Sequence, residues 1–110
     1  MTKIKIYHSN GNYYYLKSWG HADSGTDEDI VCAGISTLTQ SLYFTLLHFL
    51  QEEDLQVKQE DGFLEIEILK QDEGLAEKTN LFFLYMITGL ELLKDNYPDY
   101  LTLNIMEVQR

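Results

Sequence analysis

Cys32 is the only cysteine of the chain, and His21 precedes it by eleven positions. A strand-like run ends at Gly20 and a helical pattern begins at about Asp29, so we expect Cys32 in the first turn of a helix. Unpaired backbone N–H groups and the positive end of the helix dipole favour a thiolate there. A histidine folded back against this sulfur would complete an activated nucleophile.

A simpler interpretation of each residue stays open. A lone cysteine in a helix is most often a small buried apolar side chain, and a lone histidine after a strand is most often a surface or capping group. The residues alone therefore indicate no more than a possible thiol hydrolase.

A longer match surrounds the pair, and it consists of Gly20-His21-Ala22, Gly25, Asp29-Ile30-Val31-Cys32-Ala33 and Ser36. This segment resembles the signature of the bacterial ribosomal-processing cysteine protease family, whose members remove an N-terminal extension from large-subunit ribosomal protein twenty-seven. The resemblance implies that His21 is the catalytic base and Cys32 the nucleophile, with Asp29 and Ser36 near the site. It also implies cleavage after a Phe-rich stretch ahead of a lysine-rich body, and it favours a homodimer. Gly34 stands where we would expect alanine more often in this family.

Three residues are expected to support this pair. Asp29 has two open roles: it caps the helix, or it orients His21 and stabilises the imidazolium. The backbone N–H groups of Cys32 and Ala33, if they are free at the helix start, would serve as oxyanion donors. Ser36 follows Cys32 by one turn on the same face, where the resemblance suggests a hydrogen bond that fixes the site.

The loop between His21 and Cys32 has two possible roles. Gly20 and Gly25 let the chain turn sharply at its ends. The run Asp23 to Glu28 is either a lid that closes on substrate or a solvated loop without such a role.

Metal and nucleotide chemistry are not expected, and we predict no cofactor. Cys32 and His21 supply two ligands where a zinc site needs three or four. His8 and His48 have no acidic or thiol companion at ligand spacing, and we expect His48 to be a partly buried structural residue. No Gly-rich phosphate loop followed by Lys and Ser or Thr is present.

The charged residues of the chain indicate which kinds of molecule it can bind. Eighteen acidic and eight basic residues give a net charge of −10, and the single arginine is Arg110. Scattered lysines argue against direct nucleic-acid binding, whereas a negative surface attracts a basic polypeptide. Acidity that serves only solubility is the alternative.

Two other features predict the cellular compartment of the protein. A single cysteine and the absence of an apolar signal segment after Met1 predict a cytoplasmic protein. The longest apolar run, 81–87, is too short to span a membrane, so we expect no membrane contact.

Periodicity predicts one α+β domain over residues 1–110 with the order ββαββαβ. A hairpin turns at Asn10-Gly11 and a second hairpin at Asp61-Gly62. The two helical patterns run from about Asp29 through Phe49 and from about Leu75 to Asp95, and a last strand follows Pro98. We expect two layers, with both helices on one face of a five-stranded sheet. The other face would hold tyrosines and glutamates and meet solvent or a second subunit.

These observations favour a cysteine endopeptidase with a Cys32/His21 dyad assisted by Asp29. A non-catalytic acidic module that binds ribosomal proteins is the first alternative. A redox sensor is the second, and it is disfavoured because no second cysteine could resolve a sulfenic acid within the chain.

Overall fold

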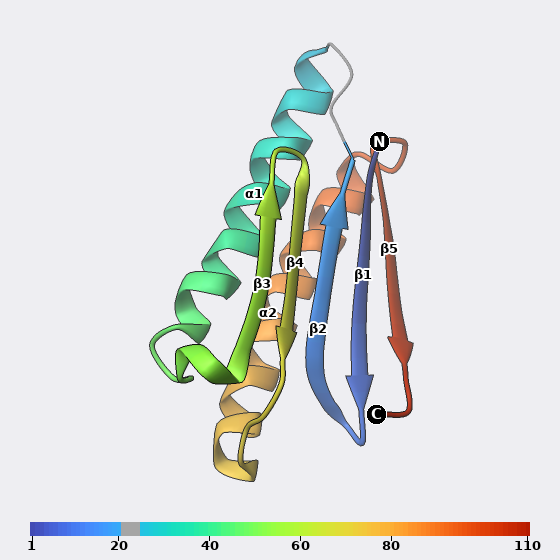
Figure 1. Ribbon diagram of the computed structural model, residues 1–110. Helices are drawn as coiled ribbons and strands as arrows, with labels where there is room; N and C mark the ends of the chain where they lie inside the picture. The colour runs from blue at the N-terminus through green and yellow to red at the C-terminus, as the bar shows by residue number, and fades with distance from the viewer. Residues whose placement is uncertain (21–24) are drawn as a thin grey trace.

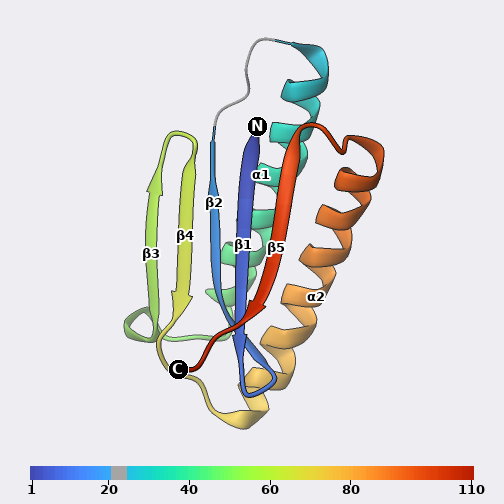
Figure 2. The ribbon, with the colours of Figure 1, turned by 90° about the vertical axis from the view of Figure 1, so that its right-hand side faces the viewer.

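The computed structural model describes residues 1–20 and 25–110. A five-stranded sheet forms one layer, and two long helices cover one of its faces (Figures 1 and 2). The elements in chain order are β1 (Thr2–Ser9), β2 (Asn12–Trp19), α1 (Thr26–Leu46), the 3₁₀ turn η1 (Glu52–Asp54), β3 (Leu55–Glu60), β4 (Phe63–Ile68), α2 (Glu73–Asn96) and β5 (Leu101–Glu107). The predicted order ββαββαβ and the two-layer arrangement are confirmed.

The strands lie in the order β3-β4-β2-β1-β5. Neighbouring strands are antiparallel except β5, which runs parallel to β1. Asn10 and Gly11 have positive φ angles of 52° and 80°, the backbone that a two-residue hairpin requires. Gly62, in the turn between β3 and β4, also has a positive φ. Both predicted hairpins are therefore present.

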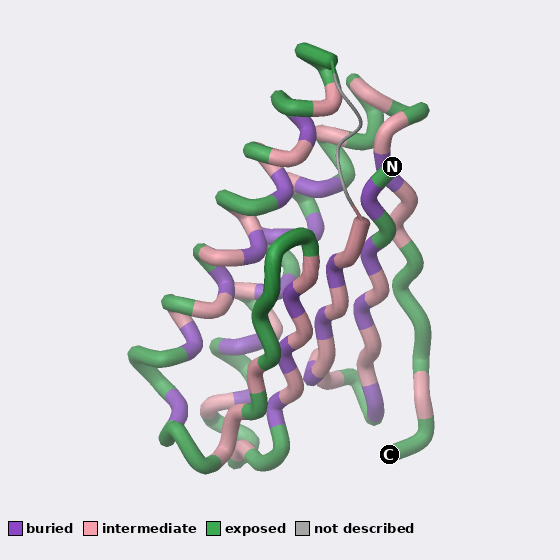
Figure 3. The backbone as a smooth tube through the Cα atoms, turned by 45° about the horizontal axis from the view of Figure 1, so that its top comes forward, coloured by how far each residue is buried: buried purple, intermediate pink, exposed green. Residues whose placement is uncertain are grey.

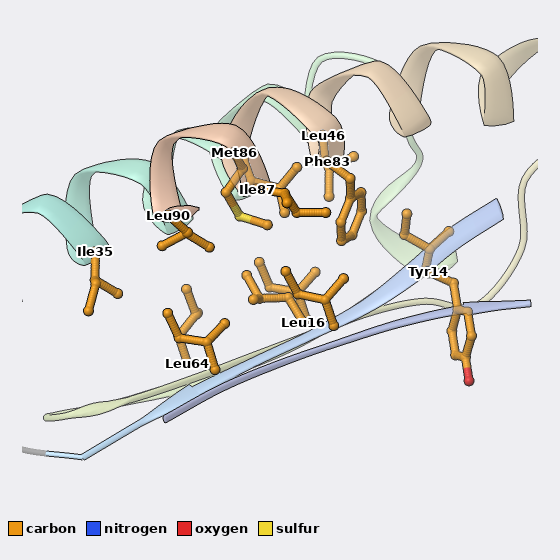
Figure 4. Packing of buried hydrophobic residues seen from close by; sticks show 14 of the residues in the cluster. Tyr14, Leu16, Ile35, Leu46, Leu64, Phe83, Met86, Ile87 and Leu90 are labelled. Atoms are coloured by element: carbon orange, nitrogen blue, oxygen red, sulfur yellow. The ribbon is translucent and has the colours of Figure 1, made fainter. Parts of the chain in front are cut away.

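The core lies between the sheet and the helices. Its sheet side consists of alternate residues of the three central strands, among them Ile4, Ile6, Leu16, Leu64 and Ile66. Figure 4 shows Leu16 and Leu64 pointing at side chains of α1 and α2, and Figure 3 shows the buried positions alternating along these strands. Period-two burial on the strands and one buried stripe on each helix enclose a single core. None of the helices in the described part of the chain is long and apolar enough to cross a membrane.

The ends of α1 differ from the prediction. The helix begins at Thr26, three residues before Asp29, and its last helical residue is Leu46. Phe49 and His48 consequently lie beyond the helix, and both are exposed. The expectation of a partly buried His48 was wrong because the chain leaves the helix before reaching it. The bounds of α2 lie within two residues of those predicted, and Asp72 caps it by accepting a hydrogen bond from the Leu75 N–H at 2.8 Å.

Two glycines let the helices approach closely. A Cβ atom at Gly34 would lie 2.9 Å from Leu93 Cδ1, and one at Gly89 would lie 2.6 Å from Leu38 Cδ2. At each glycine, a leucine side chain of the other helix therefore packs directly against the backbone. An alanine at position 34 would require the Leu93 side chain to move, because its Cβ atom would meet the Leu93 methyl groups at 2.9 and 3.0 Å.

The sheet face away from the helices carries the expected tyrosines and glutamates. Tyr7 and Tyr15 stack with ring centroids 4.6 Å apart, and the Tyr15 hydroxyl donates to Glu65. Burial and this hydrogen bond raise the pKa of the Tyr15 phenol. Lys17 lies 4.7 Å from the centre of the Trp19 ring on the same face. Figure 4 shows Tyr14 also pointing away from the helices, next to the irregular pairing between Tyr7 and His8.

Candidate active site

Cys32 borders a cleft of about 840 Å³ at one end of the sheet. Three parts of the chain form its walls. They are the start of β1 with the end of β2 (Thr2, Ser18, Gly20), one side of α1 (Cys32, Ile35, Ser36, Thr39, Gln40), and the hairpin between β3 and β4 (Gln59, Glu60, Asp61, Gly62, Phe63, Leu64). In Figure 1 the tip of this hairpin lies in front of the upper half of α1, and residues of both line the cleft. The single thiol of the chain is thus accessible from a space large enough for several side chains.

Cys32 lies in the second turn of α1 and not in the first. Helix hydrogen bonding is already established at Asp29, whose N–H donates to the Gly25 carbonyl at 3.1 Å. The backbone N–H groups of Cys32 and Ala33 are therefore inside the helix, where they donate to preceding carbonyls. The expectation of a first-turn cysteine was wrong, and these two N–H groups are not free to act as oxyanion donors. The helix dipole also acts mainly within the first turn, which Cys32 does not occupy.

Asp29 does not cap the helix. The N-cap is Gly25, and within residues 1–20 and 25–110 no side-chain hydrogen bond caps the first turn. Asp29 is exposed and precedes Cys32 by three residues, which places both on the same side of α1. Of its two predicted roles, the structure removes the capping one.

A second carboxylate lies close to the same helix face. Glu28 precedes Cys32 by four residues, and its side chain is only 13% exposed. Its Oε1 lies 3.8 Å from the Met1 amino group, and its buried Oε2 has no hydrogen-bond partner among the described residues. Sequence reasoning missed Glu28 because the residue falls before the predicted helix start.

Thr2 contacts the thiol directly. Its Oγ1 lies 3.9 Å from Cys32 Sγ, and its side chain is buried. The contact joins the start of β1 to α1 across thirty positions of sequence. No local pattern marks Thr2, so only the fold brings it to the sulfur.

Gly20 is held between two segments. Its N–H donates to the Gly62 carbonyl at 3.0 Å, which joins the end of β2 to the β3–β4 turn. Its φ is +126°, and a Cβ atom there would lie 2.3 Å from the Met1 carbonyl oxygen. Only glycine fits this position, which directly precedes His21. His21 itself lies outside the described residues, as do the first two residues of the predicted loop Asp23 to Glu28.

Of the two remaining predicted site residues, Ser36 lines the cleft and Ala33 does not. Ser36 is exposed at the cleft wall, one turn after Cys32. Ala33 is exposed outside the cleft lining, and its carbonyl accepts a hydrogen bond from Thr37 Oγ1 at 2.8 Å.

The β3–β4 hairpin supplies the cleft's charge and its aromatic ring. Glu60 and Asp61 are the acidic residues among the described lining, which contains no basic residue. Phe63 lies beside them, with Ile35 and Leu64 as further apolar lining. Sequence reasoning identified the hairpin but did not connect it with the site, because its proximity to Cys32 depends on strand order. Among the described residues, no group of three or more His, Cys, Asp and Glu is placed to hold a metal ion.

The fold and the cleft define a small two-layer α+β protein with one accessible thiol beside an acidic rim. The model of the cysteine protease Prp family matches residues 1–102, so the chain belongs to this family and is a cysteine protease.

Solved structures agree with this assignment in fold. The chain is similar to SMU.848 from Streptococcus mutans, with 29% identity, a TM-score of 0.79, and coverage of 98% of this chain and 96% of that one. It is also similar to an essential ribosomal processing protease Prp from S. aureus in complex with a substrate peptide, with 21% identity, a TM-score of 0.78, and coverage of 96% and 99%. The same protease with a covalently linked product peptide gives 21% identity and a TM-score of 0.75. The comparison with curated proteins finds no match.

Proposed function

We propose that this protease removes the N-terminal extension of bacterial large-subunit ribosomal protein twenty-seven, with Cys32 as nucleophile and His21 as base. The observation that carries the proposal is the position of the Cys32 thiol at the wall of a cleft with both apolar and acidic lining. The family membership and the S. aureus protease complexed with a substrate peptide support it.

The chemistry is that of acyl transfer through a thioester. His21 accepts the thiol proton as Cys32 Sγ attacks the scissile carbonyl, and it then delivers that proton to the leaving amine. Water, deprotonated by the same imidazole, hydrolyses the thioester and regenerates the thiol. Asp29 orients the imidazole in this proposal, and Thr2 Oγ1 helps to hold the sulfur in place.

The cleft lining fits the expected substrate on both sides of its cleavage point. Phe63, Ile35 and Leu64 provide apolar surface for a Phe-rich stretch. Glu60 and Asp61 provide negative charge for a lysine-rich body. The site thus combines the two kinds of recognition that such a substrate needs.

The test is cleavage of a peptide that spans the junction between the extension and the body of this ribosomal protein. Mass spectrometry should show one cut by the wild type and none by Cys32→Ala. His48→Ala, which changes an exposed histidine outside the cleft, serves as the control for His21→Ala. Binding without thiol-dependent cleavage would favour the alternative, a non-catalytic acidic module that binds ribosomal proteins.

We further propose that the protein acts in the cytoplasm as a homodimer. A lone cysteine that forms no disulfide suits a reducing compartment. The homodimer is an expectation from the family resemblance, and equilibrium sedimentation of the purified protein tests it.

A further inference from the structure

The oxyanion of the proposed reaction lacks the donors that the sequence led us to expect. When Cys32 attacks the scissile carbonyl, negative charge develops on the carbonyl oxygen, and hydrogen-bond donors aimed at that oxygen lower the barrier. The N–H groups of Cys32 and Ala33 lie inside α1, where they donate to preceding carbonyls. A donor for the oxyanion is therefore needed from outside the helix backbone.

Thr2 brings a hydroxyl group to this position. Its Oγ1 lies 3.9 Å from Cys32 Sγ, and both residues line the cleft. A reacting atom needs a position about 3 Å from both the nucleophile and the oxyanion donor. Because Sγ and Oγ1 are 3.9 Å apart, positions that satisfy both distances form a ring around the line that joins the two atoms. The scissile carbonyl can therefore lie against the sulfur and the hydroxyl together.

The Thr2 hydroxyl is buried next to a weak acceptor. The residue is only 5% exposed, and within residues 1–20 and 25–110 the sulfur of Cys32 is the one hydrogen-bond partner of its side chain. Sulfur accepts hydrogen bonds poorly, and a buried hydroxyl without a strong bond is costly. An apolar side chain, such as the one at Ile4 two residues further along β1, avoids this cost. The hydroxyl thus leaves a donor available beside the thiol.

The backbone at Thr2 is held from both sides. Its N–H donates to the Tyr100 carbonyl at 3.1 Å, and β1 pairs with β5 from Leu101 onward. On the β2 side, a Cβ atom at Gly20 would lie 3.1 Å from the Thr2 Cα atom, so the two backbones pack directly. Figures 1 and 2 show the start of β1, marked N, at the same end of the molecule as the first turns of α1. A donor held in this way needs no reorganisation when charge develops.

The other hydroxyl groups of the cleft lining fit the role less well. Thr39 Oγ1 donates to a carbonyl of its own helix at 2.9 Å, so its proton is already used. Ser36 and Ser18 also line the cleft, but among the described residues neither forms a hydrogen bond to the Cys32 sulfur. Thr2 therefore combines a free proton with proximity to the nucleophile.

We propose that Thr2 is a catalytic residue whose hydroxyl donates a hydrogen bond to the oxyanion of the tetrahedral intermediate. The Cys32 sulfur forms a bond to the carbonyl carbon, and the electron pair of the C=O double bond moves to the oxygen, which accepts from Thr2. When this pair returns, the C–N bond breaks and the amine leaves with the proton that His21 delivers, so Thr2 keeps its own proton. The hydrogen bond strengthens as charge develops and so raises kcat more than it lowers KM. The inference rests on Cys32 as the nucleophile of the proposed function and not on the identity of the substrate.

Substitution of Thr2 tests the donor. Thr2→Val removes the hydroxyl and keeps the shape of the side chain, so it should lower kcat for the substrate peptide at least about 10²-fold, with little change in KM. Thr2→Ser restores a hydroxyl and should keep kcat close to that of the wild type. Thr88→Val is the matched control, because Thr88 lies on α2 outside the cleft lining and its exposed hydroxyl donates to the Leu84 carbonyl. Circular dichroism establishes that each variant is folded, and Thr2→Ala repeats the measurement if valine disturbs the packing.

Two further measurements distinguish an effect on the oxyanion from an effect on the sulfur. Iodoacetamide alkylates the thiol by displacing iodide and forms no oxyanion, so its rate should be unchanged in Thr2→Val. A peptide aldehyde with the sequence that precedes the cleavage point forms a hemithioacetal, in which a C–S bond forms and the aldehyde oxygen takes up the thiol proton. Because this oxygen occupies the oxyanion position, Thr2→Val should raise the inhibition constant at least about tenfold. Binding of the uncut peptide should be equal in Cys32→Ala and Cys32→Ala/Thr2→Val.

The outcomes separate this inference from the proposed function. A wild-type kcat in Thr2→Val would overturn the donor alone, and so would a Thr2→Ser variant as slow as Thr2→Val. A parallel loss of kcat and of alkylation rate would also overturn it, because the hydroxyl would then act on the sulfur. Cleavage by Cys32→Ala at the wild-type rate would overturn the proposed nucleophile and the inference with it. Cleavage of a different peptide with the same dependence on Thr2 would support the inference and contradict the proposed substrate.

Discussion

Among the described residues, the Cys32 thiol is contacted by a buried hydroxyl at the start of β1 and borders the cleft. Thr2 lies against it from β1, while Ser36 continues the same helix face into the cleft. Helix backbone hydrogen bonds occupy the N–H groups nearest to the sulfur. In the proposed mechanism, activation of the thiol therefore depends on His21 more than on the helix start.

Cys32→Ala should fold, bind the substrate peptide and fail to cut it. Alanine is the best helix former, and the side chain is partly exposed, so the stability cost should be about 1 kcal/mol or less. Loss of the nucleophile should lower kcat by at least about 10³-fold, because nucleophile and base act as a unit. Calorimetry of binding and peptide cleavage measure the two effects. Cleavage by this variant at the wild-type rate would exclude the proposed nucleophile.

Asp29→Asn should reduce kcat less than His21→Ala does. Asp29 is exposed and does not cap the helix, so in the proposed mechanism its contribution is limited to orienting the base. His21 by contrast carries the proton in the proposed mechanism. Rates of Cys32 alkylation by iodoacetamide should follow the same ranking, with His48→Ala unchanged. Equal losses for the two variants would make Asp29 an indispensable third member of the site.

Neutralising the cleft's acidic rim should weaken binding of lysine-bearing substrates. Glu60→Gln and Asp61→Asn should each raise KM by about two- to fivefold, the range of an exposed charge pair. Glu53→Gln, in the 3₁₀ turn η1 that precedes β3, is the matched control for an exposed acid outside the cleft. A second substrate with glutamine in place of its lysines should be insensitive to all three changes. If KM for both substrates rose alike, the rim would act through structure and not through charge.

At the scale of elements, the site depends on where three strand ends meet α1. The hydrogen bond from Gly20 to Gly62 ties β2 to the β3–β4 turn, and Thr2 at the start of β1 lies beside both. The close approach of α1 and α2 at Gly34 and Gly89 sets how α1 lies on the sheet. These contacts determine the cleft's walls, although none of them takes part in chemistry.

Gly20→Ala should destabilise the protein more than Gly11→Ala. Both glycines have positive φ, a backbone that other residues rarely adopt, so each substitution introduces strain of about 1–3 kcal/mol. At Gly20 the new Cβ also meets the Met1 carbonyl oxygen at 2.3 Å, whereas at Gly11 nothing lies within 4 Å. Thermal unfolding measures the difference, and kcat/KM should fall only for Gly20→Ala, which precedes His21. Equal stabilities and rates for the two variants would show that the packing at Gly20 is unimportant.

At the scale of the whole molecule, charge decides which partners approach. The net charge of −10 surrounds a cleft whose described lining has acidic but no basic residues. The negative charge of the whole protein attracts a basic substrate from a distance, and the acidic residues of the cleft attract it again at short range.

The kcat/KM for a lysine-rich substrate should fall as salt rises. At about 0.1 M ionic strength the Debye length is about 10 Å, so the steering by distant acids is largely screened. The decline should be smaller for the glutamine-substituted substrate, which serves as the control in stopped-flow or initial-rate measurements. A flat profile for both substrates would mean that the acidity serves solubility only.

The sequence by itself determined the elements and the pair of residues with candidate chemistry. These elements are predicted by local signals. Side chains alternate every two residues in a strand and recur every 3.6 residues in a helix. The Asn10-Gly11 turn is equally local, because its backbone conformation depends on these two residues. The start of α1 escaped this reasoning. Its first turn is wholly polar or exposed and Gly25 provides no side-chain cap, so the sequence there is typical of a loop.

Only the tertiary structure decided what surrounds Cys32. Thr2 and the β3–β4 hairpin reach the cleft through strand order, which no short segment encodes, since each contact closes a long stretch of chain. The outer face of α2 shows the same limit. Its apolar residues are visible in the sequence, but a helical pattern does not say which of two apolar faces meets the sheet. The fold buries one face in the core and leaves the opposite face, with Leu81, Tyr85 and Leu92, exposed, because a helix packed on one side of a sheet presents its opposite side to solvent or to a partner.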